Sequence, residues 1–144
     1  MKFRTEVEVS RFPFSINHNS KIVLMGSCFT SNVGDKLEFG GFKTIVNPFG
    51  ITFNPVSLVS QLSQILSGKE YSKVDLYKHQ NQYLSFEHHS KFNHQDFEEV
   101  LSRINLELSQ AEKRLIEADV LFISLGSAWV WERVNTGKIV NNCH

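Results

Sequence analysis

The sequence predicts a layered α/β fold with a central parallel β-sheet. Three short, continuously apolar segments indicate strands that are buried on both faces, which is typical of parallel sheets. A glycine-containing loop follows each of them, and segments with the periodicity of amphipathic helices lie between them. Alternation of such strands and helices is the pattern of an α/β domain. The predicted buried strands are residues 22–25, 44–46 and 120–123.

The first elements are predicted from local patterns. Alternation of apolar and charged residues over 3–9 predicts a half-exposed strand. After the first buried strand, apolar residues recur every four positions up to Gly40, which predicts a tight turn and a helix. A second helix is expected to begin at Asn54 and Pro55, because asparagine is a good N-cap and proline suits the first helical position. Gly68 is expected to end that helix.

The second half of the chain predicts one long helix and two hairpins. Residues 77–86 are predicted to form a hairpin that turns at residues 80–81. The most regular helical pattern runs from near Asn93 to Ala118, with apolar residues on one face and Glu and Lys on the other. A second two-stranded segment is predicted over residues 128–141.

The composition is that of a globular protein and excludes several classes of partner. Hydrophobic residues make up 41% of the chain, and 15 basic residues balance 15 acidic ones. Because these charges cancel and no long run of one sign occurs, neither nucleic acid nor an anionic membrane is an expected partner. The charged N-terminus lacks a signal-peptide core, and no stretch has the length of a membrane span, so a cytoplasmic protein is expected. Cys28 and Cys143 are expected to be thiols, and neither a metal nor a cofactor is expected.

Length and ending predict a single but incomplete domain. A chain of 144 residues is enough for one ordinary domain. It ends directly after an apolar, strand-like segment, without a following helix or polar tail. We therefore expect residues 1–144 to be the N-terminal portion of a longer domain, truncated at the C-terminus. A truncated sheet has an open apolar edge, which favours self-association.

The loop after the first buried strand is the first candidate for chemistry. It joins a strand to a helix, so its side chains lie at the sheet edge where α/β proteins bind ligands. A helix N-terminus stabilises a thiolate and can hold an oxyanion, which places Cys28 or Ser27 as a nucleophile. The alternative, which these residues alone favour, is that Ser27 or Thr30 caps the helix and Cys28 is a small buried residue.

The loops after the other two buried strands are predicted to reach the same edge. In the second loop, Gly50 is placed to offer its backbone N–H to an anionic oxygen. In the third loop, Gly126 has no side chain and so lets a bound group approach the backbone closely. Each glycine is alternatively an ordinary turn residue. The candidate substrate-binding residues are Asn47, His89, Trp129 and His144.

Several blocks along the chain resemble the GSCFA family. They occur in the family's order and span nearly the whole sequence. The family looks like a branch of the SGNH/GDSL hydrolase-like superfamily, whose members are mostly esterases, acyl hydrolases and O-acetyltransferases. The resemblance implies a three-layer, flavodoxin-like (SGNH-type) fold. The blocks are GSCFT at 26–30, NPFG at 47–50 with NP at 54–55, SFEHHS at 85–90, LGSAW at 125–129 and NCH at 142–144.

The resemblance also implies roles for individual residues. The superfamily's nucleophilic serine falls on Cys28, and Ser27, in the place of an aspartate, is the alternative nucleophile. The oxyanion-hole glycine falls on Gly50. The third block places its glycine on Gly126 but has Ala128 where the superfamily has an asparagine donor, and loss of one such donor costs about 3 kcal/mol. The superfamily's Asp-x-x-His block has no counterpart in this chain, so residues 1–144 are expected to be catalytically inactive on their own.

Two functions follow as hypotheses. The first is acyl-ester hydrolysis or acyl transfer on a small-molecule or carbohydrate ester, with a CoA-linked acyl donor as one option for transfer. The second is a non-catalytic carbohydrate-binding or interaction module on a hydrolase-like fold. Ala128 and the aromatic residues Phe49, Trp129 and Trp131 motivate it, because aromatic rings suit sugar faces as well as core packing.

Overall fold

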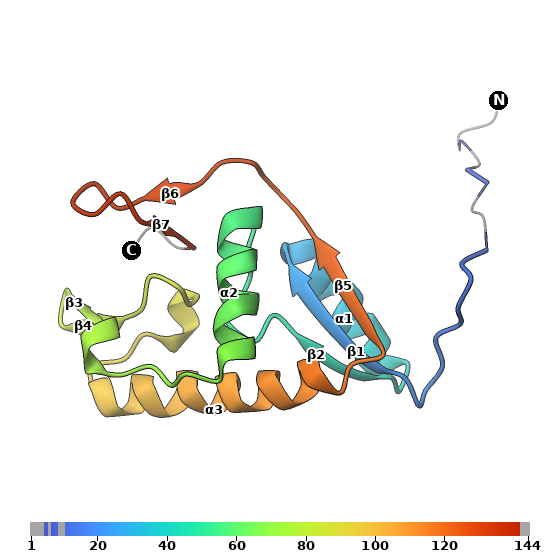
Figure 1. Cartoon of the computed structure of the whole chain (residues 1–144), viewed down its shortest axis with the longest axis horizontal. Coiled ribbons are helices and arrows are strands. Elements are labelled where there is room, and N and C mark those ends of the chain that lie inside the picture. The colour runs from blue at the N-terminus through green and yellow to red at the C-terminus, as the bar shows by residue number, and fades with distance from the viewer. Residues whose placement is uncertain (1–4, 6, 9–10, 142–144) are drawn as a thin grey trace.

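The largest sheet among the described residues is parallel and three-stranded, and it lies toward one side of the folded part in Figure 1. The computed structural model describes residues 5, 7–8 and 11–141. Strand β1 (Lys21–Gly26) lies between β2 (Lys43–Val46) and β5 (Val120–Ser124), in the order β2-β1-β5. In register, Val23 of β1 is opposite Ile45 and Leu121. The predicted α/β class is confirmed, and strands are present at all three predicted positions, but only β1 is buried along most of its length, whereas β2 is half-buried.

Helices cover both faces of this sheet. Helix α1 (Cys28–Phe39) packs on one face, and Gly34 of α1 lies directly against Val46 of β2. Val23 and Met25 of β1 enter a core with α2 (Pro55–Ser67) and α3 (Phe97–Ile116). Because side chains alternate along a strand, the other residues of β1 face α1. The three layers are compatible with a flavodoxin-like fold.

Helix α2 begins and ends at the residues predicted to cap it. The Asn54 side chain accepts a hydrogen bond from the Ser57 N–H at 2.8 Å, Pro55 is the first helical residue, and Gly68 ends the helix at φ +59°. Helix α3 begins later than the predicted Asn93, because Asp96 is its N-cap and accepts from the Glu98 N–H at 2.9 Å. A short 3₁₀ helix, η2 (Ser90–Phe92), precedes it.

Both predicted hairpins are present. Strands β3 (Tyr77–His79) and β4 (Gln82–Leu84) are antiparallel, and both turn residues between them have positive φ. A 3₁₀ helix, η1 (Lys73–Asp75), leads into β3. Strands β6 (Trp131–Glu132) and β7 (Ile139–Val140) form the second hairpin, which lies near the N-terminal end of α2 in Figure 1.

Two strand predictions need correction. Strand β5 is not buried on both faces: Leu121, Phe122 and Ile123 are 39%, 41% and 49% exposed. Its exposure follows from its position at a sheet edge, where it pairs with β1 alone among the described residues. In the predicted N-terminal strand, Thr5 and Val7 are exposed and lie in no strand, and its other apolar positions fall outside the described residues.

Candidate functional site

The loops that follow β1, β2 and β5 meet at the carboxyl end of the sheet. The Gly26 N–H donates to Asn47 Oδ1 at 2.8 Å, which joins the first loop to the second. The Ser27 N–H donates to both the carbonyl oxygen and the Oγ of Ser124 at 3.1 Å, which joins the first loop to the third. The convergence expected of a parallel α/β sheet is thus confirmed.

Ser27 and Cys28 have opposite environments although they are neighbours. Ser27 stands at the N-cap position of α1 but makes no side-chain capping bond. It is buried, and its Oγ lies 2.9 Å from Ser124 Oγ. The buried Thr30 hydroxyl contacts the same Ser124 hydroxyl. These serine and threonine hydroxyls therefore tie α1 to β5, and the predicted capping role of Ser27 is wrong.

Cys28 is an exposed cysteine at the first position of α1. The alternative that it is a small buried residue is therefore wrong. Its carbonyl oxygen accepts a hydrogen bond from Asn32 Nδ2 at 2.9 Å, one turn later in the helix. A helix N-terminus presents N–H groups without intrahelical partners, so the thiol stands where negative charge is favoured. Of the two nucleophile candidates, only Cys28 is open to an incoming substrate.

Asn47 shapes the second loop with its whole side chain. It is buried, adopts a positive φ of 44°, and its backbone N–H donates to the Leu24 carbonyl at 2.9 Å. Its Oδ1 accepts from Gly26, and its Nδ2 donates to Ser31 Oγ at 2.9 Å. Both ends of the amide are thus bound to protein groups, so in this conformation Asn47 orients the loop around Cys28.

The backbone N–H groups of the two candidate glycines are occupied. The Gly50 N–H donates to the Asn47 carbonyl at 2.8 Å, and the Gly126 N–H donates to the Phe53 carbonyl at 2.9 Å. Neither is free to hold an oxyanion in this conformation, although Gly50 does have a positive φ of 92°. A Cβ on Gly50 would lie 2.2 Å from His89 Cβ, so the glycine also permits close packing.

The remaining candidates lie in different surroundings. His89 is half-buried against Gly50, and its Nδ1 accepts from the Lys91 N–H at 3.2 Å. Trp129 is 89% exposed, and Trp131 is also exposed. Phe49 is fully buried and packs on other rings, so the idea that it offers a sugar-binding face is wrong. His144 lies outside the described residues.

Comparison with known proteins places the chain in a family. The family model of the GSCFA family matches residues 21–144, which include all three loops. The chain belongs to the GSCFA family. No curated protein and no solved structure matches it. Within the part of this GSCFA chain that the structure describes, no helix is long and apolar enough to cross a membrane. The same residues contain no group of three or more side chains suited to hold a metal ion.

Sequence reasoning missed three polar residues that hold the GSCFA loops together. Ser124 joins the first and third loops, as described above. Thr52 and Gln61 are buried: Thr52 Oγ1 donates to Gln61 Oε1 at 2.9 Å, and the Thr52 N–H donates to the Gly26 carbonyl at 2.8 Å. Gln61 Nε2 in turn donates to the Glu87 carbonyl at 3.1 Å. A signal existed for Gln61, since it interrupts the apolar stripe of α2.

Asn47→Ala is expected to lower the free energy of unfolding of the GSCFA chain by about 2–3 kcal/mol. The change leaves the buried Gly26 N–H without its acceptor, which costs about 1–3 kcal/mol, and it places alanine at a positive φ. Ser31→Ala removes only the partner of the other amide end and should cost less than 1 kcal/mol. Urea unfolding of both variants checks this, and equal losses would contradict the role given to Oδ1.

Proposed function

We propose that this GSCFA chain contributes the nucleophile of an acyl-ester hydrolase or O-acyltransferase of the SGNH/GDSL type. The single observation behind the proposal is the exposed Cys28 thiol at the N-terminus of α1, where the three loops meet. Ser27, the alternative nucleophile, is buried and bonded to Ser124. Small-molecule and carbohydrate esters are the proposed substrates.

The reaction would proceed through a thioester. The Cys28 sulfur attacks the acyl carbon, the alcohol leaves with a proton from a general acid, and an acyl-Cys28 intermediate remains. Water then releases the acid in hydrolysis, whereas an acceptor hydroxyl takes the acyl group in transfer, for which a CoA thioester is a suitable donor. The N–H of Cys28 at the helix N-terminus is the proposed oxyanion donor. Gly50 can join it only if its bond to the Asn47 carbonyl opens.

Acyl trapping on the full-length protein tests this function. Incubation with p-nitrophenyl acetate should acetylate Cys28, as read by peptide mass spectrometry, and iodoacetamide should block that acetylation. Cys28→Ala should abolish the adduct and lower turnover by about 10³-fold or more. Ser27→Ala and Cys143→Ala should keep the adduct. An adduct that survives in Cys28→Ala and disappears in Ser27→Ala would contradict the assignment of the nucleophile.

A carbohydrate-binding module is the second candidate function. The observations in its favour are the exposed Trp129 and Trp131, the occupied N–H groups of Gly50 and Gly126, and the alanine at 128. Solvent-exposed tryptophan rings pack well on sugar faces. Glycan-array binding that survives Cys28→Ala and is lost in Trp129→Ala would favour this function over catalysis.

A further inference from the structure

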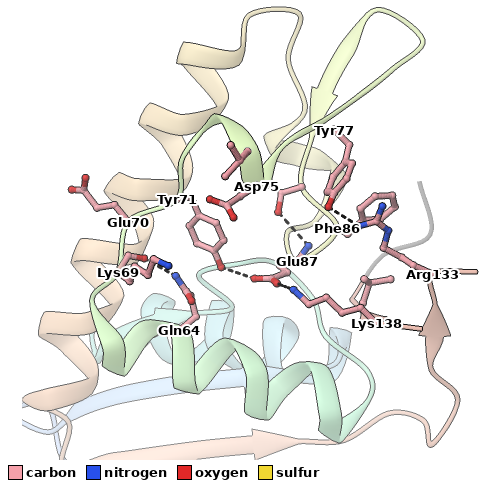
Figure 2. A pocket seen from close by; sticks show the side chains of 13 residues that line it. Gln64, Lys69, Glu70, Tyr71, Asp75, Tyr77, Phe86, Glu87, Arg133 and Lys138 are labelled. Atoms are coloured by element: carbon pink, nitrogen blue, oxygen red, sulfur yellow. Dashed lines mark hydrogen bonds and ion pairs between the residues drawn. The ribbon is translucent and has the colours of Figure 1, made fainter. Parts of the chain in front are cut away.

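A second polar pocket lies apart from the Cys28 loops, and we propose that it binds a small hydroxylated carboxylate, such as an acidic sugar. The pocket has a volume of about 210 Å³ and lies between the residues after α2, the loop after β4 and the β6–β7 hairpin (Figure 2). None of its lining residues belongs to the three loops around Cys28. This inference is independent of the proposed acyl chemistry.

Arg133 supplies the carboxylate-binding group. Its guanidinium lies 4.3 Å from the centre of the Tyr77 ring and 4.8 Å from that of Phe86, and its Nη1 donates to the Tyr77 hydroxyl at 2.5 Å. Stacking on two rings holds the planar group in place before any ligand arrives. No carboxylate within residues 11–141 forms a salt bridge with it. A guanidinium with free donors matches a carboxylate bidentately.

The opposite wall suits hydroxyl groups. Glu87 accepts from the Tyr71 hydroxyl at 2.9 Å and from Lys138 Nζ at 2.5 Å, so its charge is already balanced. Tyr71 is buried, and this burial together with Glu87 raises the pKa of its phenol, which keeps it a neutral donor. Lys138 retains two N–H donors, and each Glu87 oxygen retains a lone pair, so the array can bond to hydroxyls. Figure 2 shows Tyr71, Glu87 and Lys138 in a connected row.

The charges around the pocket specify the ligand further. Lys138 balances Glu87, Lys69 and Glu70 at the rim have opposite charges, and Asp75 is bound within the Ser72 capping box. The lining residues thus carry three positive and three negative charges and have no net charge, and Arg133 contributes a cation that forms no ion pair within residues 11–141. A guanidinium without an ion-pair partner, beside an array that can bond to hydroxyls, fits a ligand with one carboxylate and several hydroxyls. The volume suits a single sugar ring rather than a polymer.

Titration of the whole chain with D-glucuronate, followed by ¹H–¹⁵N NMR, tests the proposal. Glucuronate should shift the Arg133 Nε–H signal and the amides of the β6–β7 hairpin, whereas D-glucose, which lacks the carboxylate, should bind at least about tenfold more weakly. Arg133→Leu should weaken glucuronate binding about tenfold or more. Arg133→Lys should also weaken it, because lysine keeps the charge but loses the planar fork.

Control variants keep the test decisive. Arg103→Gln removes an arginine that pairs with Glu99 on the surface of α3, and it should leave glucuronate binding unchanged. If Arg133→Leu does not fold, Lys138→Met should still weaken binding, because it removes the donors on the opposite wall. Equal affinity for glucuronate and glucose would overturn the proposal. So would unchanged binding in a folded Arg133 variant, or shifts confined to residues outside the pocket.

Discussion

Gly26→Ala is expected to lower the free energy of unfolding by about 4 kcal/mol, a large part of the stability of an ordinary domain. Gly26 ends β1 at a φ of +138°, which other residues rarely adopt. A Cβ there would lie 1.9 Å from the Ser124 carbonyl oxygen and 2.9 Å from its Oγ. Strands β1 and β5 would have to separate, so backbone strain and overpacking, about 1–3 kcal/mol each, add together.

Gly41→Ala is the matched control for this prediction. Gly41 also has a positive φ, +82°, but a Cβ there would meet only the His18 ring, at 3.7 Å. The free energy of unfolding of Gly41→Ala should fall by about 1 kcal/mol, through backbone strain alone. Urea unfolding of both variants at 25 °C separates the two effects. If both lose the same stability, the close approach of Gly26 to Ser124 is not a feature of the folded protein.

The elements that the sequence predicted well are those set by neighbouring residues. Asn54, Pro55 and Gly68 delimit α2 because a cap and a C-terminal glycine act within one turn. The turn of the β3–β4 hairpin was likewise found from its local pattern. Helix α3 shows the limit of such signals, since Asn93 and Asp96 are both good N-caps and only the folded chain selects Asp96.

Properties that depend on distant residues could not be predicted. The apolar run of β5 resembles that of β1, yet within the described residues β1 is flanked by two strands and β5 by one, so Phe122 is exposed while Leu24 is buried. Hydrophobicity alone does not record how many neighbours a strand has. The sequence also could not show how β5 contributes to the site through Ser124.

The same limit applies to the candidate nucleophiles. The strand–turn–helix pattern correctly placed Ser27 and Cys28 at the sheet edge, but it gave no reason to separate them. Ser27 is withdrawn from solvent by Ser124, which is 97 residues away in the chain. Gly50 was proposed as a donor from its residue type, and its N–H is occupied by the Asn47 carbonyl only three residues earlier. Sequence patterns locate such a loop, whereas hydrogen bonds decide which of its groups remain available.

Acidification from pH 7 to pH 4 is expected to cost the protein about 3 kcal/mol of stability through one residue, His88. His88 is 0% exposed, and its Nδ1 lies 2.9 Å from Ser85 Oγ. The rings that pack against it include Phe49, Tyr71 and Phe92. Burial, with a smaller effect from the charge of Lys91, lowers the pKa of His88 from 6.5 to about 3.

The sign follows from where each state binds the proton. Below pH 6.5 the unfolded chain protonates His88, whereas the folded chain does so only near pH 3. Stability therefore falls with pH between these values, by about 1.4 kcal/mol per unit, and this contribution is constant below pH 3. His88→Gln, whose amide can still bond to Ser85, is the control, because all carboxylates titrate in both proteins. Urea unfolding from pH 4 to pH 7 should show about 3 kcal/mol less acid destabilisation in the variant, and parallel curves would mean that His88 is not neutral and buried in the folded state.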